Sequence, residues 1–241
     1  MTGEPARPDI RDVLFDLDDT LFAHRSAVEA GVRAHRTATG LPGNHAAEFA
    51  RWNELEEHHY HRYLAGELGF TEQRRVRVQE FVAAHGVALD DAAADAWYAA
   101  YLLEYRAAWT LHDDTLACLT ALADRGIRLG IITNGELDFQ STKLEGTGIR
   151  PWFEQVVASG ELGIAKPDAR IFQHACALFG VAPEEAAYVG DRLGTDAIGA
   201  ADAGLTGVWL ARHGSTEPQL LAARAAGAHV IHTLAELPAL L

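Results

Sequence analysis

The sequence contains little cysteine and no long apolar run. Its 241 residues include two cysteines, Cys118 and Cys176, which fall in separate predicted helices without metal-ligand spacing. We expect packed free thiols in a reducing cytoplasm and no disulfide framework. No apolar run is long enough to cross a bilayer, and residues 1–11 carry prolines and mixed charges in place of an apolar leader. These absences predict a soluble cytoplasmic protein.

Basic residues are also scarce. The chain has 20 lysines and arginines against 34 aspartates and glutamates, which gives a formal net charge of -14. This charge disfavours long-range attraction to nucleic acids and anionic membranes, so neither is an expected partner. An anionic small-molecule substrate would need cations placed locally in its site. The length of 241 residues is enough for one large α/β domain or a core domain with a smaller insertion. Hydrophobic residues make up 49% of the chain, so a sizeable core can be buried.

The chain from Thr115 onward alternates between helix and strand, and a short apolar strand, Val13–Phe15, opens the sequence. Further strands are expected over 128–133, 153–158, 186–189, 205–210 and 229–231. Helices are expected over 115–125, 139–147, 168–179, 195–203 and 219–226. This alternation predicts an α/β fold with a doubly wound, Rossmann-like parallel sheet and helices on both faces.

The region from about Ala23 to Trp109 lacks strand-like alternation and predicts four or five helices inserted into that domain. Its aromatic residues recur mostly three to four positions apart, which is typical of a helix-bundle core. They are Trp52, Tyr60, Tyr63, Phe81, Trp97, Tyr101, Tyr105 and Trp109.

The opening strand ends in an acidic run, D-L-D-D-T, over residues 16–20. Ligands of open α/β sheets bind beyond the carboxyl ends of the strands, which is where Asp16 and Asp18 fall. Residues two apart on an extended backbone point to the same side, so both carboxylates are expected to face one pocket. Such a pair is a metal site, an acid/base pair, or both. Asp19 and Thr20 are explained by turn and helix-cap preferences.

Three further predicted strands are followed by polar residues of the kind that a phosphate site needs. The first leads into T-N-G, the second into S-G-E-L-G-I-A-K-P-D, and the third into G-D-R-L-G-T-D. A hydroxyl, backbone amides at a chain reversal and a lysine can all donate to an anion. Each fragment alone is a weak signal of a phosphate site. Their occurrence in this order, each directly after a predicted parallel strand, is informative. The candidate residues are Thr133, Asn134, Gly135, Lys166, Asp191 and Asp196.

In this order the motifs resemble the four motifs of the haloacid dehalogenase superfamily. A helical insertion directly after the first motif is similar to the C1-type cap of that superfamily. The resemblance therefore implies a Rossmann-like catalytic core over 1–22 and 111–241, and a helical cap over 23–110. It also implies a phosphatase-like hydrolase that acts on a small soluble phosphate ester.

The resemblance implies a role for each acidic residue. Asp16 would attack phosphorus and form an aspartyl-phosphate. Mg²⁺ would be bound by the Asp16 carboxylate, the Asp18 backbone carbonyl and Asp191, with Asp196 as a further carboxylate of the metal shell. Asp18 would protonate the leaving oxygen and then deprotonate the attacking water.

The same resemblance assigns phosphoryl binding to the remaining motif residues. The hydroxyl of Thr133, the amides of Asn134 and Gly135, and the Lys166 ammonium would bind the phosphoryl oxygens and stabilise the charge that develops during transfer.

Alternatives stay open at this stage. A 2-haloacid dehalogenase characteristically lacks the second aspartate, so Asp18 favours a phosphatase. A phosphomutase shares the core residues, and a catalytically idle binding protein would keep the fold. The chain is expected to be a monomer or homodimer.

Substrate selection is assigned to the cap. Candidates near the motif and a predicted turn are Phe22, His24, Arg25, Arg74, Arg75 and Arg77. Most of these, and the cluster His58, His59 and His61, are expected to be solvated helix faces. Arg192 occupies a position where a small residue is also common in the superfamily, and it either narrows the pocket or points away.

Overall fold

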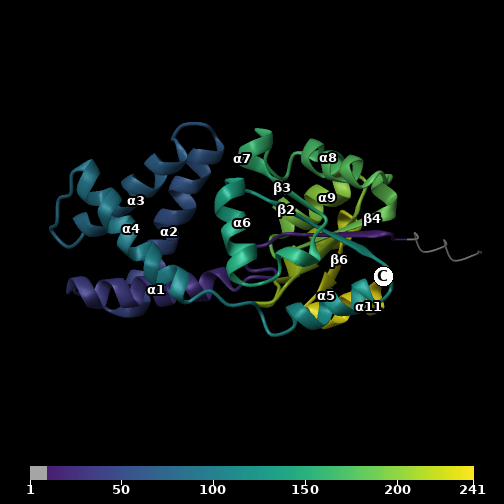
Figure 1. Ribbon diagram of the computed structural model, residues 1–241, viewed down its shortest axis with the longest axis horizontal. Helices are drawn as coiled ribbons and strands as arrows, with labels where there is room; N and C mark the ends of the chain where they lie inside the picture. The colour runs from purple at the N-terminus through teal and green to yellow at the C-terminus, as the bar shows by residue number, and fades with distance from the viewer. Residues whose placement is uncertain (1–9) are drawn as a thin grey trace, which may run out of the picture. The chain divides into compact units, whose positions relative to one another are not determined.

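The computed structural model describes residues 10–241, and within them six strands form one parallel sheet in the order β3-β2-β1-β4-β5-β6 (Figure 1). The strands are β1 (Asp12–Phe15), β2 (Arg128–Thr133), β3 (Gln155–Ala158), β4 (Ala186–Gly190), β5 (Thr206–Leu210) and β6 (His229–Ile231). The first strand therefore lies at the centre of the sheet, between β2 and β4. The prediction of a doubly wound parallel sheet is confirmed. The first nine residues, expected to carry no apolar leader, lie outside the described residues.

Strand β1 is buried on both faces, which explains why it reads as an unbroken apolar run. Val13, Leu14 and Phe15 are at most 1% exposed. Asp12 begins the strand and accepts two hydrogen bonds from the guanidinium of Arg128, at 2.7 and 2.8 Å. This pair joins the N-terminal ends of β1 and β2. It therefore lies at the edge of the sheet opposite to the polar motifs, which follow the carboxyl ends of the strands.

Helices cover both faces of the sheet (Figure 1). They are α5 (Thr115–Ala123), α6 (Leu137–Gly146), α7 (Ser159–Leu162), α8 (Ala169–Phe179), α9 (Gly199–Asp202), α10 (Glu217–Ala225) and α11 (Leu237–Leu240). On the α8 and α9 face, Phe172 packs edge-on against Tyr188 with ring centroids 5.0 Å apart. One expected helix, 195–203, has a different form: a π-helical turn over Leu193–Ile198 precedes the short α9. Strand β3 is shorter than expected because Arg150–Trp152 forms a 3₁₀ turn just before it.

The chain forms two compact units, one made of the chain up to Ala23 together with Leu111–Leu241, and the other of His24–Thr110. The second unit contains the helices α1 (His24–Thr39), α2 (His45–Leu64), α3 (Phe70–Ala83) and α4 (Asp91–Ala107). Helices α1 and α4 approach closely at Gly31, where a Cβ would lie 2.9 Å from the backbone of Tyr105. No helix in residues 10–241 is long and apolar enough to span a membrane.

The expected aromatic core of the helical unit is present. Trp52 is fully buried, and its ring centroid lies 5.1 Å from that of Phe81 and 4.7 Å from that of Tyr101. The two cysteines are also buried and free, as predicted. Burial raises the pKa of Cys118 to about 12 and that of Cys176 to about 11, so both thiols stay protonated and unreactive at neutral pH.

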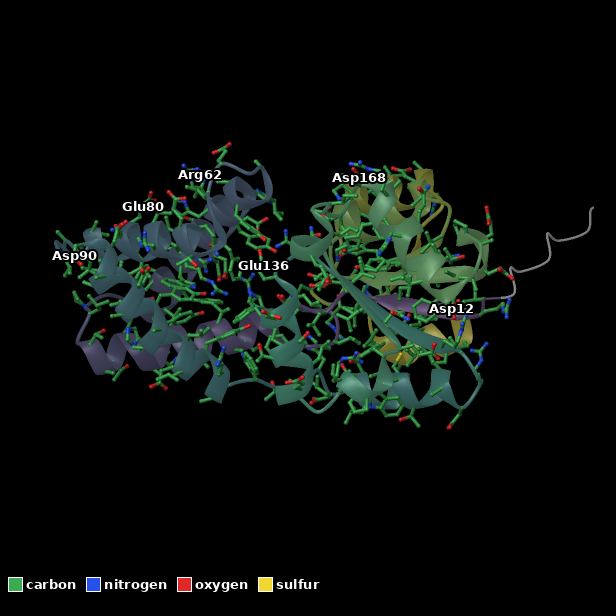
Figure 2. All side chains as sticks on the ribbon, turned by 45° about the horizontal axis from the view of Figure 1, so that its top comes forward. Asp12, Arg62, Glu80, Asp90, Glu136 and Asp168 are labelled. Carbon is green, nitrogen blue, oxygen red and sulfur yellow. The ribbon has the colours of Figure 1, made fainter. Side chains whose placement is uncertain are left out.

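Two polar residues of the helical unit, His59 and Arg77, are buried. His59 has a fully buried side chain and its Nε2 lies 3.2 Å from the carboxylate of Glu80, whose exposed side chain is labelled in Figure 2. The assignment of the whole histidine cluster to a solvated face was therefore wrong for His59, although His58 and His61 are exposed. Arg77 is 2% exposed, so it is an exception among the cap candidates, most of which were expected on solvated helix faces.

Arg77 is buried because it has a charged partner on α2 and a polar partner on its own helix α3. Its guanidinium donates to Glu56 at 2.5 Å and to Gln73 at 2.6 Å. His24 Nε2 lies 3.8 Å from the same Glu56 carboxylate, and its Nδ1 is 2.9 Å from the hydroxyl of Tyr105. A charge-paired network therefore runs through the interior of the bundle, where an unpaired charge would be costly.

The surroundings of three histidines predict that stability depends on pH. Burial lowers the pKa values of His35, His59 and His112, so in each case the folded state binds its proton less tightly than the unfolded state. The unfolded state takes up these protons first as pH falls below about 6.5. We expect the free energy of unfolding to fall in that direction, as measured by urea unfolding between pH 8 and 5.5.

A matched pair of variants tests this origin. His35→Gln should flatten the pH dependence, whereas His61→Gln, whose side chain is 63% exposed, should leave it as in the wild type. A His35→Gln protein with an unchanged slope would contradict the assignment.

Candidate active site

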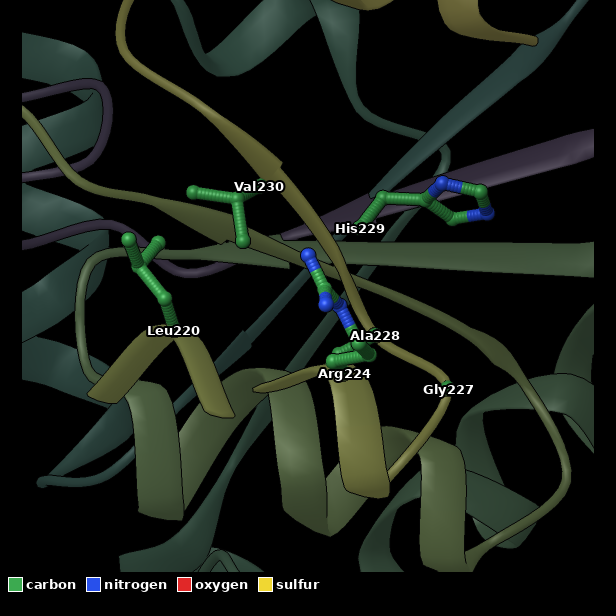
Figure 3. A pocket seen from close by; sticks show the side chains of 6 residues that line it. All are labelled: Leu220, Arg224, Gly227, Ala228, His229 and Val230. Atoms are coloured by element: carbon green, nitrogen blue, oxygen red, sulfur yellow. The ribbon is translucent and has the colours of Figure 1, made fainter. Parts of the chain in front are cut away.

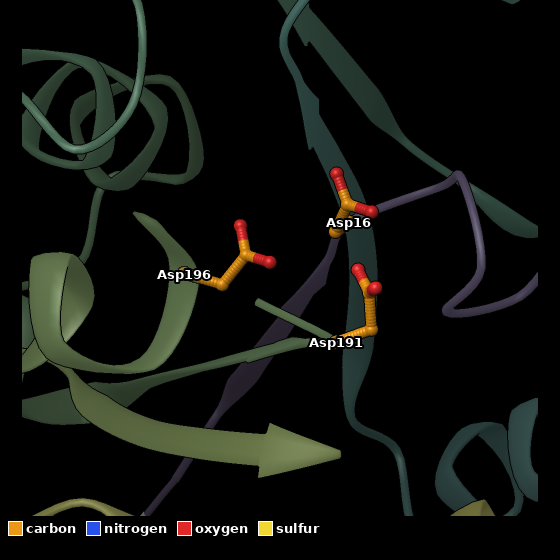
Figure 4. Close-up of side chains that lie close together, drawn as sticks. All are labelled: Asp16, Asp191 and Asp196. Atoms are coloured by element: carbon orange, nitrogen blue, oxygen red, sulfur yellow. The ribbon is translucent and has the colours of Figure 1, made fainter. Parts of the chain in front are cut away.

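The motif residues meet at the carboxyl edge of the sheet. Asp16 directly follows β1, Thr133 ends β2, and Asp191 directly follows β4, while Asp196 comes from the π-helical turn. One carboxylate oxygen from each of Asp16, Asp191 and Asp196 lies within 4.8 Å of the others (Figure 4). The structure thus brings Asp16 next to two carboxylates that follow it by 175 and 180 positions in the sequence.

Lys166 lies beside this cluster and uses all three of its donors. Its Nζ donates to Asp16 Oδ1 at 2.6 Å, to Asp196 Oδ1 at 2.8 Å and to the hydroxyl of Tyr188 at 2.5 Å. Burial alone would lower the pKa of Lys166, but the charges of the two aspartates more than offset this, and the pKa is raised. The lysine therefore stays charged and holds the carboxylate that follows β1.

The carboxylates themselves are crowded. Burial, opposed by Lys166 and reinforced by Asp196, raises the pKa of Asp16 to about 6. Burial and the charges of Asp16 and Asp196 raise the pKa of Asp191 well above its usual value. The cluster carries more negative charge than one lysine neutralises.

A divalent cation fits this donor set. Carboxylate oxygens from three directions are the ligands that Mg²⁺ prefers, and a cation offsets the repulsion that raises the pKa values. Within residues 10–241 no side chain forms a hydrogen bond or salt bridge with the Asp191 carboxylate, whereas its backbone is tied down by Thr20 Oγ1 and Trp209 Nε1. The residues that could bind the metal through their side chains are therefore Asp16, Asp191 and Asp196.

Asp196 is the most firmly held of the three. Its Oδ1 accepts from Lys166, and its Oδ2 accepts from the backbone N–H of Arg192 at 2.9 Å. Gly190 makes this approach possible, because a Cβ there would lie 2.4 Å from the Asp196 carboxylate. The side chain of Arg192 is exposed, and only its backbone contributes to this contact.

The Asp18 side chain does not join the three-carboxylate cluster. Both of its oxygens accept from Lys143 Nζ, at 2.7 and 2.8 Å, and Oδ2 is 3.3 Å from the amide nitrogen of Gln140. The chain turns sharply after it, since Asp19 adopts a left-handed conformation with φ of 59°. Asp16 and Asp18 are therefore each paired with a different lysine, and their sharing of one pocket stays a prediction.

The T-N-G segment is also tied to its surroundings. Thr133 Oγ1 accepts from Gln140 at 2.6 Å, so its own proton is left to donate to a ligand. The Asn134 side chain bridges the backbone N–H and carbonyl of Lys166, at 2.9 and 3.1 Å. The Gly135 amide donates to Ser159 Oγ at 2.9 Å and would have to exchange this partner to bind a phosphoryl oxygen.

The sequence analysis did not predict four residues that contact the motif residues: Gln140, Lys143, Ser159 and Tyr188. Gln140 and Lys143 are three positions apart in α6, so they lie on one face of the helix, and this spacing directly after T-N-G was an available signal. Tyr188 lies within an apolar strand, and nothing in the local sequence distinguishes it from a core residue.

A separate hollow of about 460 Å³ is formed near the end of the chain (Figure 3). It is lined by Leu220, Arg224, Gly227, Ala228, His229 and Val230. None of the motif residues lines it, and the chemistry described above does not involve it.

The parallel sheet carries three clustered carboxylates and a buried lysine at its carboxyl edge. This arrangement is typical of a Rossmann-like α/β enzyme whose oxygen ligands can bind a metal ion. The model of the haloacid dehalogenase-like hydrolase family matches residues 10–204, and the chain belongs to that family. The predicted membership of the superfamily is confirmed, and the protein is a hydrolase.

The chain is similar in sequence to several phosphatases. It is 34% identical to a glyceraldehyde 3-phosphate phosphatase of Methanopyrus kandleri over 84% of each chain. It is 46% identical to a phosphoserine phosphatase of Thermus thermophilus over 107 residues, which span 44% of this chain and only 43% of that relative.

Among solved structures, the putative HAD-hydrolase YfnB from Bacillus subtilis, bound to magnesium, matches with a TM-score of 0.78. The match has 23% sequence identity and covers 96% of this chain and 98% of the other. It shows a common fold.

Proposed function

We propose that this hydrolase cleaves a small soluble phosphomonoester in a magnesium-dependent reaction through an aspartyl-phosphate on Asp16. The observation that carries the proposal is the pairing of Asp16 with Lys166 beside Asp191 and Asp196. Two similar proteins that are phosphatases support it. The proposed partners are a phosphate ester and, at most, a second copy of this chain.

In the first half of the reaction, an Asp16 oxygen forms a bond to phosphorus while the bond to the leaving oxygen breaks. Lys166 holds the attacking carboxylate in place through the 2.6 Å contact and keeps positive charge next to the transferring group. The Thr133 hydroxyl, with the backbone amides of Asn134 and Gly135, donates to phosphoryl oxygens. Bound Mg²⁺, held by Asp16, Asp191, Asp196 and the Asp18 backbone carbonyl, would supply charge neutralisation between the nucleophile and the phosphate.

Asp18 transfers the protons. Its carboxyl group protonates the leaving oxygen, so an alcohol departs, and the resulting carboxylate then takes a proton from water. The water oxygen bonds to phosphorus, the bond to Asp16 breaks, and inorganic phosphate is released with Asp16 restored. We further propose that the helical unit His24–Thr110 is the substrate-selecting cap.

The experiment is phosphate release from a panel of small phosphomonoesters, with Mg²⁺ and with a chelator. We expect turnover that the chelator abolishes and that added Mg²⁺ restores. Asp191→Asn should raise the Mg²⁺ concentration needed for half-maximal rate by at least about tenfold, because supporting contacts alone are worth 10- to 100-fold in metal affinity. Asp138→Asn, an exposed aspartate on α6, is the matched control and should behave as the wild type.

The rival activities have distinct products. Chloride release from 2-haloacids without added metal would identify a dehalogenase and contradict the proposal. Transfer of phosphate between two positions without release of inorganic phosphate would identify a mutase. Tight binding of an ester without turnover would indicate a binding protein.

A further inference from the structure

The chain has only two lysines, against 18 arginines. In the folded structure both lysines contact aspartates of the first motif, residues 16–20. Lys166 pairs with Asp16, and Lys143 pairs with Asp18. Their side chains are 2% and 3% exposed. A chain that otherwise uses arginine places its two compact ammonium groups against the two aspartates of D-L-D, where a wider guanidinium would need more room.

The contacts of Lys143 hold it in one place. Its Nζ lies 2.7 and 2.8 Å from the two oxygens of Asp18, and 5.4 and 5.1 Å from the ring centroids of Phe22 and Phe139. Aromatic faces attract a cation, and more strongly when it is desolvated. Lys143 is therefore fixed between two rings and directed at a single carboxylate.

Helix α6 connects this contact to the phosphate-binding residues. Gln140, one turn before Lys143, donates to Thr133 Oγ1 at 2.6 Å and is 3.3 Å from Asp18 Oδ2. Asp18 thus has two partners on one helix. Its side chain is 29% exposed, so packing alone does not fix its position. A carboxylate without these partners, two residues from Asp16, would be drawn to a divalent cation bound at Asp16 and Asp191.

We propose that Lys143 is a positioning residue that holds the Asp18 side chain away from the metal site and within reach of the leaving oxygen. The inference rests on the proposed phosphatase function. It differs from a purely structural ion pair, which would tie α6 to the turn without any preference among substrates.

The kinetic test uses Lys143→Met and two classes of ester. An alkyl phosphate needs a proton on its leaving oxygen, whereas p-nitrophenolate leaves without one. We expect kcat/KM to fall at least about 10²-fold for the alkyl ester, the lower range for loss of general acid catalysis, and only a few-fold for p-nitrophenyl phosphate. Arg170→Met, which breaks an exposed 2.7 Å ion pair in the same unit, should affect both esters equally and little.

A double-mutant cycle with Asp18→Asn tests whether Lys143 acts through Asp18. In the Asp18→Asn background, Lys143→Met should cause no further loss on the alkyl ester. Mg²⁺ titration followed by thermal shift gives a second readout: Mg²⁺ should bind more tightly to Lys143→Met, and this gain should disappear in the double variant. If Lys143→Met does not fold, Lys143→Arg keeps the charge and should show the same selective loss to a smaller extent.

Equal losses on both esters, or additive losses in the cycle, would overturn the inference while leaving the phosphatase function intact. A wild-type protein that releases no phosphate from any ester would instead overturn the proposed function. The two failures are therefore distinguishable.

Discussion

Asp16→Asn should abolish phosphate release, with a loss in kcat of at least about 10⁴-fold, on the scale known for removal of a catalytic nucleophile. An amide oxygen is a poor nucleophile, and the variant also loses one metal ligand. In the absence of metal, the Asp16→Asn protein should nevertheless be at least as stable as the wild-type protein. The raised pKa of Asp16 shows that burial and Asp196 disfavour its charged form, and the substitution removes that charge.

Phosphate release and thermal unfolding of the same preparations check this prediction. The combination of lost activity with retained or increased stability separates a chemical role from a structural one. Asp138→Asn, the exposed control, should keep both properties. A fully active Asp16→Asn protein would rule out the aspartyl-phosphate.

Glu56→Gln should destabilise the helical unit by about 3–5 kcal/mol, because it leaves the guanidinium of Arg77 buried without its charged partner. Burial alone would raise the pKa of Glu56, but Arg77 and His24 lower it overall. The carboxylate therefore contributes stability that is present above its unfolded pKa and is lost as pH falls through the folded value. Urea unfolding followed by tryptophan fluorescence measures the effect.

The neighbouring residue supplies the control. Glu57 pairs with His61 on the exposed face of the same helix, so Glu57→Gln should change the free energy of unfolding by less than about 1 kcal/mol. The double variant Glu56→Gln with Arg77→Met should be more stable than Glu56→Gln alone, since the unpaired charge is gone. Additive losses in the double variant would show that the two residues act independently.

Much of the sheet was predictable because its strands are short apolar segments between turn and helix signals. Strand β2 matches its expected bounds, and β6 does as well. The helix expected over 195–203 is present, but it begins with a π-helical turn, because nothing in the local pattern distinguishes such a turn from an α-helix. That turn brings Asp196 to Lys166, a contact between residues 30 positions apart.

Site residues were predictable where a motif marked them and not where packing alone decides. Asp16, Asp191 and Asp196 were identified in advance and lie together in the structure. Their catalytic roles remain predictions. Lys143 and Arg77 look like ordinary exposed helix charges in the sequence, and each becomes buried only because a distant carboxylate, on Asp18 or Glu56, is folded against it.

The route of the chain into and out of the helical unit has an evolutionary consequence. The sheet-bearing unit is left at Ala23 and re-entered at Leu111, and an antiparallel bridge joins Phe22 to Leu111. With those two points already held side by side, the length of what is inserted between them adds little to the loop-closure entropy of the sheet. The insertion can therefore be shortened, lengthened or exchanged for another module while D-L-D-D-T keeps its place at the end of β1.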